Sequence, residues 1–307
     1  MRTVLAADLG GTKCRFALVG EDLSVHAPQV VPTLDETEPF VAAMDRAFEE
    51  LLSTGVDGAA APSAIGVGVA GIVTRGERYL EGIPNLPLDE FPLREHLESK
   101  FGLPVTLLND GRASAWGEYL RGAAKGQDPL LTLFFGTGIG IGLVVDGSPY
   151  AGARNAAGEI GHTVYRPGGR RCVCGRLGCF EGYCGGGPMT TRAAEELGPH
   201  PDGRRWTVTD LLELAATNPA AREILKDAED AACAMVASLA TLLNPGAIVL
   251  GGGVLQAWPE LQEKLEASTR AWVTRAVGDE LMFATSEGGS DAILWGAAMA
   301  TGGLDAS

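Results

Sequence analysis

The sequence has no hydrophobic run of transmembrane length and comparatively few positive charges. A membrane-spanning helix needs about 20 mostly apolar residues in a row, so no membrane partner is expected. Lys and Arg number 24 against 39 Asp and Glu, which gives a formal net charge of −15. This charge repels nucleic acid and anionic lipid, so binding to nucleic acid is not expected. An anionic ligand would need backbone N–H groups, helix N-termini or Mg²⁺.

The N-terminal segment also lacks the basic stretch and apolar segment of a signal peptide. The six cysteines show no spacing typical of a disulfide framework, since three lie close together and Cys14, Cys184 and Cys233 are scattered. Free thiols fit a reducing compartment, and the expected location is cytoplasmic. With 46% hydrophobic residues and no linker or low-complexity segment, the 307-residue chain should fold compactly, with room for two lobes.

The most specific chemistry lies in the stretch GEIGHTVYRPGGRRCVCGRLGCFE at positions 158–181. Cys172, Cys174 and Cys179 form a C-x-C-x₄-C pattern, and His162 precedes it by ten positions. A Cys₃His set suits tetrahedral Zn²⁺, and four protein ligands leave no position for a catalytic water. The metal is therefore expected to be structural. The alternative is a chance meeting of these four side chains in one loop.

Two glutamates, Glu159 and Glu181, bracket the expected metal ligands. A metal bound to His162 would fix the loop that carries both carboxylates. The sequence therefore suggests that the metal holds a polar binding pocket in shape.

A strand, glycine turn and second strand are predicted at the N-terminus, where an apolar run ends in Asp8. The turn contains Gly10, Gly11 and Thr12 and is followed by Lys13. Its N–H groups and hydroxyl could bind a phosphate, and Asp8 could bind Mg²⁺ through water. The turn does not match a Walker A loop, and an ordinary glycine turn is the alternative.

The same pattern recurs where the apolar run 130–135 enters Gly136, Thr137 and Gly138 and a further apolar run follows. A Rossmann motif does not fit, because no long helical pattern follows these glycines. Two such patterns suggest two lobes of similar fold that face one nucleotide. Later in the chain, a strand at 247–250 enters a triple glycine at 251–253. Glycines allow close approach of the backbone, which suits adenosine, while a tight strand-to-helix turn is the alternative.

The strand predicted at 104–108 ends at Asn109 and Asp110. Ligands of open α/β sheets bind at the carboxyl ends of the strands. There Asp110 could accept a proton from a substrate hydroxyl, whereas the alternative role is N-cap of the helix that follows. Asn85, in a loop-like segment, is a further candidate to hydrogen bond a polar ligand. Apolar periodicity predicts helices at 36–53, 88–101, 188–197, 208–216, 228–243, 260–276 and 291–300.

These motifs together resemble the ROK family of bacterial sugar kinases and related repressors, and the resemblance runs nearly from end to end. The matching segments are DLGGTKCR, LNDGRASAWGE, FFGTGIGIGLVVDG, GEIGH with the C-x-C-G-x-x-G-C-x-E run, and IVLGGGV. One glycine motif is weak evidence, whereas five in the family's order are specific.

The resemblance implies an α/β, two-lobed actin-like ATPase or hexokinase fold of the ribonuclease H-like class, with a cleft between the lobes. Residues 1–109 with about 290–307 would form the small lobe, and 110–289 the large lobe with the zinc loop. A homodimer or homotetramer is expected.

The resemblance further implies an ATP- and Mg²⁺-dependent glucokinase that phosphorylates the 6-hydroxyl of glucose, with Asp110 as the general base. The sugar would be bound by Asn85, Asn109, Asp110, Glu159, His162 and Glu181. ATP would be bound by Asp8, Gly10, Gly11, Thr12, Lys13, Gly136, Thr137, Gly138, Gly251 and Gly252. Structural Zn²⁺ would be bound by His162, Cys172, Cys174 and Cys179.

Two other functions stay open. An N-acetylglucosamine or N-acetylmannosamine kinase would use the same catalytic motifs and differ in the loops near 70–85 and Asn155. A non-catalytic sugar sensor, like the family's repressors, is disfavoured. Those repressors carry a DNA-binding extension before the first phosphate motif, whereas Asp8 is near the start of this acidic chain, and a nucleic-acid reader should show a basic patch.

Overall fold

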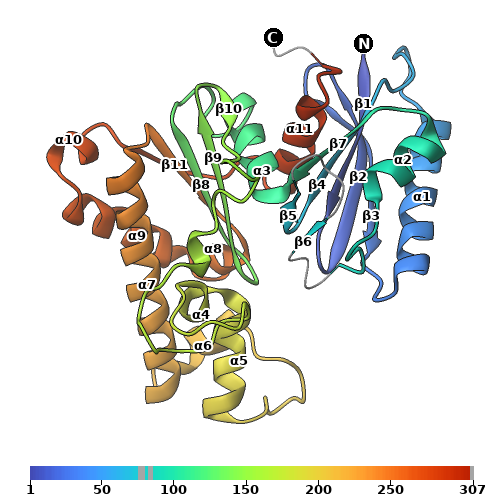
Figure 1. The fold of residues 1–307 in the computed structure, drawn as a ribbon. Coiled ribbons are helices and arrows are strands. Elements are labelled where there is room, and N and C mark those ends of the chain that lie inside the picture. Colours follow the sequence, from blue (N-terminus) through green and yellow to red (C-terminus); the bar gives the residue numbers. More distant parts are fainter. Residues whose placement is uncertain (75–79, 82–85, 305–307) are drawn as a thin grey trace. The chain divides into compact units, whose positions relative to one another are not determined.

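The computed structural model describes residues 1–74, 80–81 and 86–304. The chain divides into two compact units. The first unit comprises Met1–Gly126, Gly142–Ala157 and Glu287–Ser307, and the second comprises Gln127–Ile141 and Gly158–Ser286. Both are built from strands and helices (Figure 1).

The sheet of the first unit has five strands in the order β3-β2-β1-β4-β7. Their bounds are β1 Thr3–Leu9, β2 Lys13–Gly20, β3 Val25–Pro32, β4 Ile65–Val69 and β7 Val105–Asn109. β1 is antiparallel to β2 and parallel to β4, which is parallel to β7. The carboxyl ends of β1, β4 and β7 therefore meet at one edge, the edge at which open α/β sheets bind ligands.

Both faces of this sheet are covered by helices, α1 (Thr37–Thr54) and α2 (Leu93–Phe101) on one side and α3 (Asp110–Leu120) and α11 (Ser290–Ala300) on the other (Figure 1). Side chains alternate along a strand. Leu5 and Ala7 accordingly belong to the core beneath α1 and α2, and Val4 and Ala6 to the core beneath α11. Burial on both faces explains why β1 reads as a nearly continuous apolar run.

The second sheet has the order β10-β9-β8-β11-β12. Its strands are β8 (Leu130–Phe135), β9 (Ile139–Val145), β10 (Ser148–Pro149), β11 (Ala247–Gly251) and β12 (Met282–Thr285). β8, β11 and β12 run parallel to one another. The carboxyl end of β8 leads into one candidate glycine turn and that of β11 into the triple glycine.

The longest helix of the second unit is α7 (Pro219–Leu243), which contacts α4, α5, α6 and α9. Its other helices are η1 (Ile160–His162), α4 (Glu181–Cys184), α5 (Gly186–Leu197), α6 (Val208–Leu214), α8 (Gly253–Ala257), α9 (Pro259–Trp272) and α10 (Arg275–Gly278). In the first unit, β5 (Ile72–Val73) pairs antiparallel with β6 (Leu80–Glu81). Within the described residues, we find no helix with the length and apolar character needed to span a membrane.

The predicted helices are present with differences at the ends, except that the one predicted at 260–276 is divided into α9 and α10, because the backbone of Val273 is extended. α7 begins at Pro219 rather than 228, because the side chain of Asn218 accepts hydrogen bonds from the first backbone N–H groups and Pro suits the first turn. α2 begins only at Leu93, after its N-cap Pro92. The strands β3, β5, β6, β10 and β12 and the short helices η1, α4 and α8 were not predicted. β3 pairs only with β2, and its half-exposed side chains give a weak hydrophobic signal.

α3 and residues 142–157 belong to the first unit, whereas the division predicted from the sequence begins the large lobe at 110. α3 packs closely on α11, since a Cβ on Gly296 would lie 1.9 Å from the backbone oxygen of Ala113. The division into two functional lobes stays a prediction.

Candidate active site and metal centre

The first glycine turn connects β1 to β2 and is held from one side. Gly10 O accepts a hydrogen bond of 2.6 Å from the hydroxyl of Thr33. The N–H groups of Gly11 and Thr12 donate to no backbone carbonyl in the part of the chain that the structure describes. This turn can therefore offer consecutive N–H groups to an anion, as its sequence predicts.

Asp8, at the end of β1, is the most perturbed carboxylate of the first unit. Burial and the nearby charge of Asp110 raise its pKa to about 7, and the cations Arg15 and Lys13 oppose the rise. Strongly shifted groups near a ligand-binding edge are typical of functional sites. A cation bound beside Asp8 would keep it ionised.

Arg15 is a residue that the sequence analysis missed as a site residue. It is the cross-strand partner of Asp8 in the hairpin register. One guanidinium nitrogen, Nη2, donates to Asp291 Oδ1 at 2.7 Å, and Nη1 is buried with no hydrogen-bond partner among the described residues. Its position opposite Asp8 in a short hairpin is the signal that could have identified it.

Asn109 and Asp110 lie at the junction of β7 and α3. The N-cap of α3 is Asn109, whose Oδ1 accepts from Arg112 N at 3.1 Å. The alternative that Asp110 is the N-cap is therefore wrong. Asn109 Nδ2 donates to Gly71 O at 2.9 Å and to Asp110 Oδ1 at 3.0 Å. Asn109 thus orients the carboxylate of Asp110, which also accepts from Gly111 N at 2.8 Å.

The second glycine turn, Gly136 to Gly138, lies between β8 and β9 in the second unit. Gly186 N donates to Gly136 O at 2.9 Å and Gly187 N to Thr137 O at 2.8 Å, so the beginning of α5 holds the carbonyl side of the turn. The N–H groups of Thr137 and Gly138 have no backbone acceptor within the described ranges. The two glycine turns therefore share one chemical design.

Gly251 and Gly252 connect β11 to α8. Gly252 has a φ of 100°, and a Cβ there would lie 2.4 Å from Phe135 O, so only glycine fits. The segment is the tight strand-to-helix turn that the sequence analysis held as an alternative. Contact with adenosine stays a prediction.

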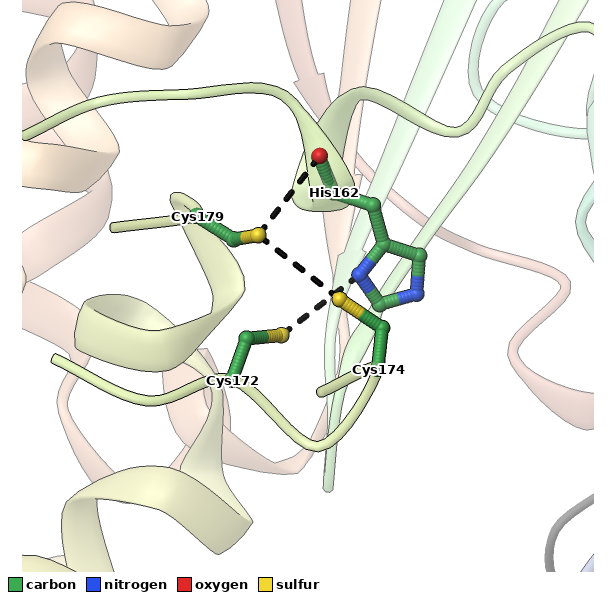
Figure 2. A group of neighbouring side chains, drawn as sticks. All are labelled: His162, Cys172, Cys174 and Cys179. Atoms are coloured by element: carbon green, nitrogen blue, oxygen red, sulfur yellow. Dashed lines mark hydrogen bonds between the residues drawn. The ribbon is translucent and has the colours of Figure 1, made fainter. Parts of the chain in front are cut away.

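The four predicted metal ligands come together in the second unit. Figure 2 shows the three cysteine side chains and the ring of His162 turned toward one another. One ligand atom from each of the four residues lies within 4.8 Å of all the others. The predicted assembly of the four donors is confirmed.

Two separations within this cluster match those expected around a tetrahedral metal. Bond lengths of about 2.3 Å to sulfur and about 2.1 Å to nitrogen place two sulfurs about 3.8 Å apart and a sulfur and nitrogen about 3.6 Å apart. Cys174 and Cys179 Sγ are 3.7 Å apart, and Cys172 Sγ is 3.6 Å from His162 Nδ1. The Cys₃His chemistry and these separations both suit Zn²⁺.

Protonation of the cysteines differs across the cluster. Burial raises the pKa of Cys172 to about 12. Burial would raise that of Cys174 too, but hydrogen bonds from the Arg176 N–H and from Cys172 and Cys179 lower its pKa to about 7. Metal binding must remove the thiol protons, so the affinity of the cluster for the metal should decrease as the pH is lowered.

The two glutamates beside the cluster differ in exposure. Glu159 is exposed, and its Oε2 lies 4.0 Å from His162 Nε2, the ring nitrogen that the cysteines leave free. Glu181 is only 6% exposed, and its Oε2 accepts from Ile139 N at 2.9 Å. Its Oε1 lies 3.8 Å from His162 Nδ1. The buried glutamate therefore contacts protein groups on both sides.

The candidate residues fall into two groups, one in each unit. The first unit contains Asp8, Gly10, Gly11, Thr12, Lys13, Asn109 and Asp110, and the second contains Gly136, Thr137, Gly138, Glu159, His162, Cys172, Cys174, Cys179, Glu181, Gly251 and Gly252. Asn85 lies outside the described residues.

A sequence model of the ROK family matches residues 4–301, so the chain belongs to the ROK family. The glucokinase of Streptomyces coelicolor is 30% identical over 289 residues, which cover 89% of each chain. The N-acetylmannosamine kinase of Vibrio cholerae is 31% identical over 309 residues, 97% of this chain and 98% of that one.

A solved ROK family glucokinase from Streptomyces griseus, in complex with glucose and AMPPNP, is also similar. It has a TM-score of 0.80 at 30% identity and covers 97% of this chain and 98% of its own. The predicted α/β fold of the two-lobed, actin-like hexokinase class is confirmed.

We expect Asp8→Asn to stabilise the ligand-free protein at pH 8. The pKa of Asp8 is about 7 when folded and near 3.8 when unfolded. Its contribution to stability is therefore fully present below about pH 4 and lost as pH rises through 7, whereas Asn is neutral throughout. The gain in the free energy of unfolding of Asp8→Asn over wild type should grow between pH 4 and pH 7 and then level off at no more than about 4 kcal/mol.

Thermal unfolding across this pH range measures the effect, with the exposed Asp57→Asn as the matched control. A difference between Asp8→Asn and wild type that does not change with pH would contradict the assignment.

For the metal, we expect purified protein to hold about one zinc per chain and Cys174→Ser to lose most of it, because one thiolate ligand is removed. Elemental analysis measures the ratio. Cys233→Ser is the control, since Cys233 lies on α7 and its thiol contacts Lys264 O. Zinc-free wild type from zinc-supplied cultures would exclude the site.

Proposed function

We propose that this protein is an ATP-dependent glucokinase, which transfers the γ-phosphoryl group of ATP to the 6-hydroxyl of glucose. The coarser class is an ATP-dependent sugar kinase of the ROK family, and the chain belongs to that class. The observation that carries the proposal is the pair of glycine turns with available N–H groups, each near a carboxylate, Asp8 in the first unit and the buried Glu181 in the second. They lie in a chain that glucokinases match over most of its length.

Phosphoryl transfer requires positioning, a base for the acceptor hydroxyl and stabilisation of phosphate charge. Bound Mg²⁺ would supply part of that charge stabilisation. In our proposal the N–H groups of the two turns, with Thr12 and Lys13, hold the phosphates, and Asp8 holds the hydrated cation. Gly251 and Gly252 allow the backbone to approach adenosine closely.

Asp110 is the proposed general base on the sugar hydroxyl. Its carboxylate is held by Asn109 Nδ2 and Gly111 N, so its direction is fixed before a substrate arrives. The sugar ligands that we propose are Asn85, Asn109, Asp110, Glu159, His162 and Glu181. A hydroxyl of the wrong epimer would leave a buried partner unpaired at a cost of about 1–3 kcal/mol.

The proposed role of Zn²⁺ is structural, because the four protein donors complete its tetrahedron. The ion would fix His162 and the glutamates beside it, while taking no part in phosphoryl transfer. We also propose a homodimer or homotetramer, and a cytoplasmic role in glycolysis, which six free thiols suit.

The second candidate is an N-acetylmannosamine kinase, favoured by the relative in Vibrio cholerae, whose match covers 97% of this chain. The same turns and base would serve it. The two candidates differ in the group at carbon 2 of the sugar, so substrate preference separates them.

A coupled assay of ADP release should show the highest kcat/KM with glucose among glucose, mannose, fructose, N-acetylglucosamine and N-acetylmannosamine. Omission of Mg²⁺ is the control and should abolish turnover. Preference for an N-acetyl sugar would replace the first candidate by the second. Absence of turnover with every sugar would contradict both.

We expect Asp110→Asn to lower kcat by about 10²–10⁴-fold, the contribution typical of a general base. Sugar affinity should change little, because the amide keeps the shape of the side chain. Steady-state kinetics and calorimetric titration with glucose measure the two quantities. The control is Asp89→Asn at an exposed position. Near wild-type turnover would show that Asp110 is not the base.

A further inference from the structure

Three hydrogen bonds join the second glycine turn and the residue after it to the segment that follows the cysteine ligands. Ile139 N donates to Glu181 Oε2 at 2.9 Å, Gly186 N to Gly136 O at 2.9 Å, and Gly187 N to Thr137 O at 2.8 Å. All three partners lie within eight residues after Cys179, the last of the cysteine ligands. The short segment that follows the metal cluster therefore determines the position of the turn.

In one of these three hydrogen bonds the acceptor is a side chain, that of Glu181, which lies close against the turn. A Cβ on Gly138 would lie 2.5 Å from its Oε2, and a Cβ on Gly161 would lie 3.4 Å from its own Cβ. The carboxylate thus occupies space that the missing side chain of Gly138 leaves in the turn, and Glu181 also lies beside Gly161 of the GEIGH motif. At 6% exposure, it has little freedom to move.

The other oxygen of Glu181 faces the metal cluster. Oε1 lies 3.8 Å from His162 Nδ1 and 3.8 Å from Cys172 Sγ. Those two atoms are a metal-ligand pair in the cluster described above. One carboxylate therefore bridges from two metal donors to the backbone N–H that follows the glycine turn.

We propose that Glu181 is a positioning residue that transmits the order of the metal centre to the turn at 136–138, so that metal occupancy controls nucleotide affinity. The proposed function enters only in naming a nucleotide phosphate as the ligand of the turn. The role differs from a sugar contact, because its effect is on the nucleotide and is present without sugar. Without the metal, the cysteine loop loosens, Glu181 loses its fixed position and the turn loses one of its three ties.

Amide hydrogen exchange of sugar-free and nucleotide-free protein tests the tie directly. We expect Glu181→Ala to speed exchange at Ile139 by about tenfold or more, the size of effect typical of a lost hydrogen bond to a charged group. Glu181→Gln keeps an acceptor oxygen and should stay within about threefold of wild type. Glu213→Ala, at an exposed position on α6, is the control and should leave the exchange unchanged.

Removal of the metal by a chelator tests the other half. Wild type without metal should show the same faster exchange at Ile139, while the buried strand β11 keeps its slow exchange. The dissociation constant for ADP, measured by calorimetry, should rise about tenfold in both chelated wild type and Glu181→Ala.

Unchanged exchange at Ile139 and unchanged ADP affinity in Glu181→Ala would overturn the proposal, as would equal effects of Gln and Ala. A rise in exchange that includes β11 after chelation would also contradict it, since the metal would then act on the whole unit. These readouts need no turnover. A protein that passes them and phosphorylates no sugar would refute the proposed function alone.

Discussion

Each unit carries a carboxylate close to a glycine turn, Asp8 in the first unit and the buried Glu181 in the second, and the proposed chemistry depends on this arrangement. In the first unit, burial and Asp110 raise the pKa of Asp8 to about 7 at the end of β1. Isolated buried charge is unfavourable, so Asp8 favours a cation, and Arg15 and Lys13 already lower its pKa. In the ligand-free protein the ionised Asp8 lowers the stability of the fold, and bound Mg²⁺ would compensate its charge. Such unfavourable groups are common at functional sites.

In the second unit, the buried carboxylate is compensated by a backbone donor instead. Glu181 accepts from Ile139 N and faces two metal donors with its other oxygen. The Cys₃His centre therefore has a role beyond local stability in our account. A small loop can hold a buried side chain in one position only if something fixes the loop, and a metal with four protein ligands does so with few residues.

The sequence predicted the features that depend on local pattern. Strand and glycine spacing located both hairpin turns, and C-x-C-x₄-C with His162 located the four metal donors. Contacts between segments far apart in the chain could not be predicted from the sequence. Asn109 rather than Asp110 caps α3, which depends on the direction of the chain at the end of β7. The bond from Ile139 to Glu181 and the pair of Arg15 with Asp291 join residues 42 and 276 positions apart. The roles of individual site residues remain predictions.

The central claim is transfer of the γ-phosphoryl group to one hydroxyl of glucose, and the position of phosphorus in the product tests it most directly. A phosphorus–proton correlation NMR spectrum of the product formed from glucose and ATP records that position. Our account predicts a correlation from the phosphorus to the two protons on carbon 6, with ADP formed in equal amount. A correlation to the anomeric proton, or inorganic phosphate as the only new phosphorus signal besides ADP, would contradict it.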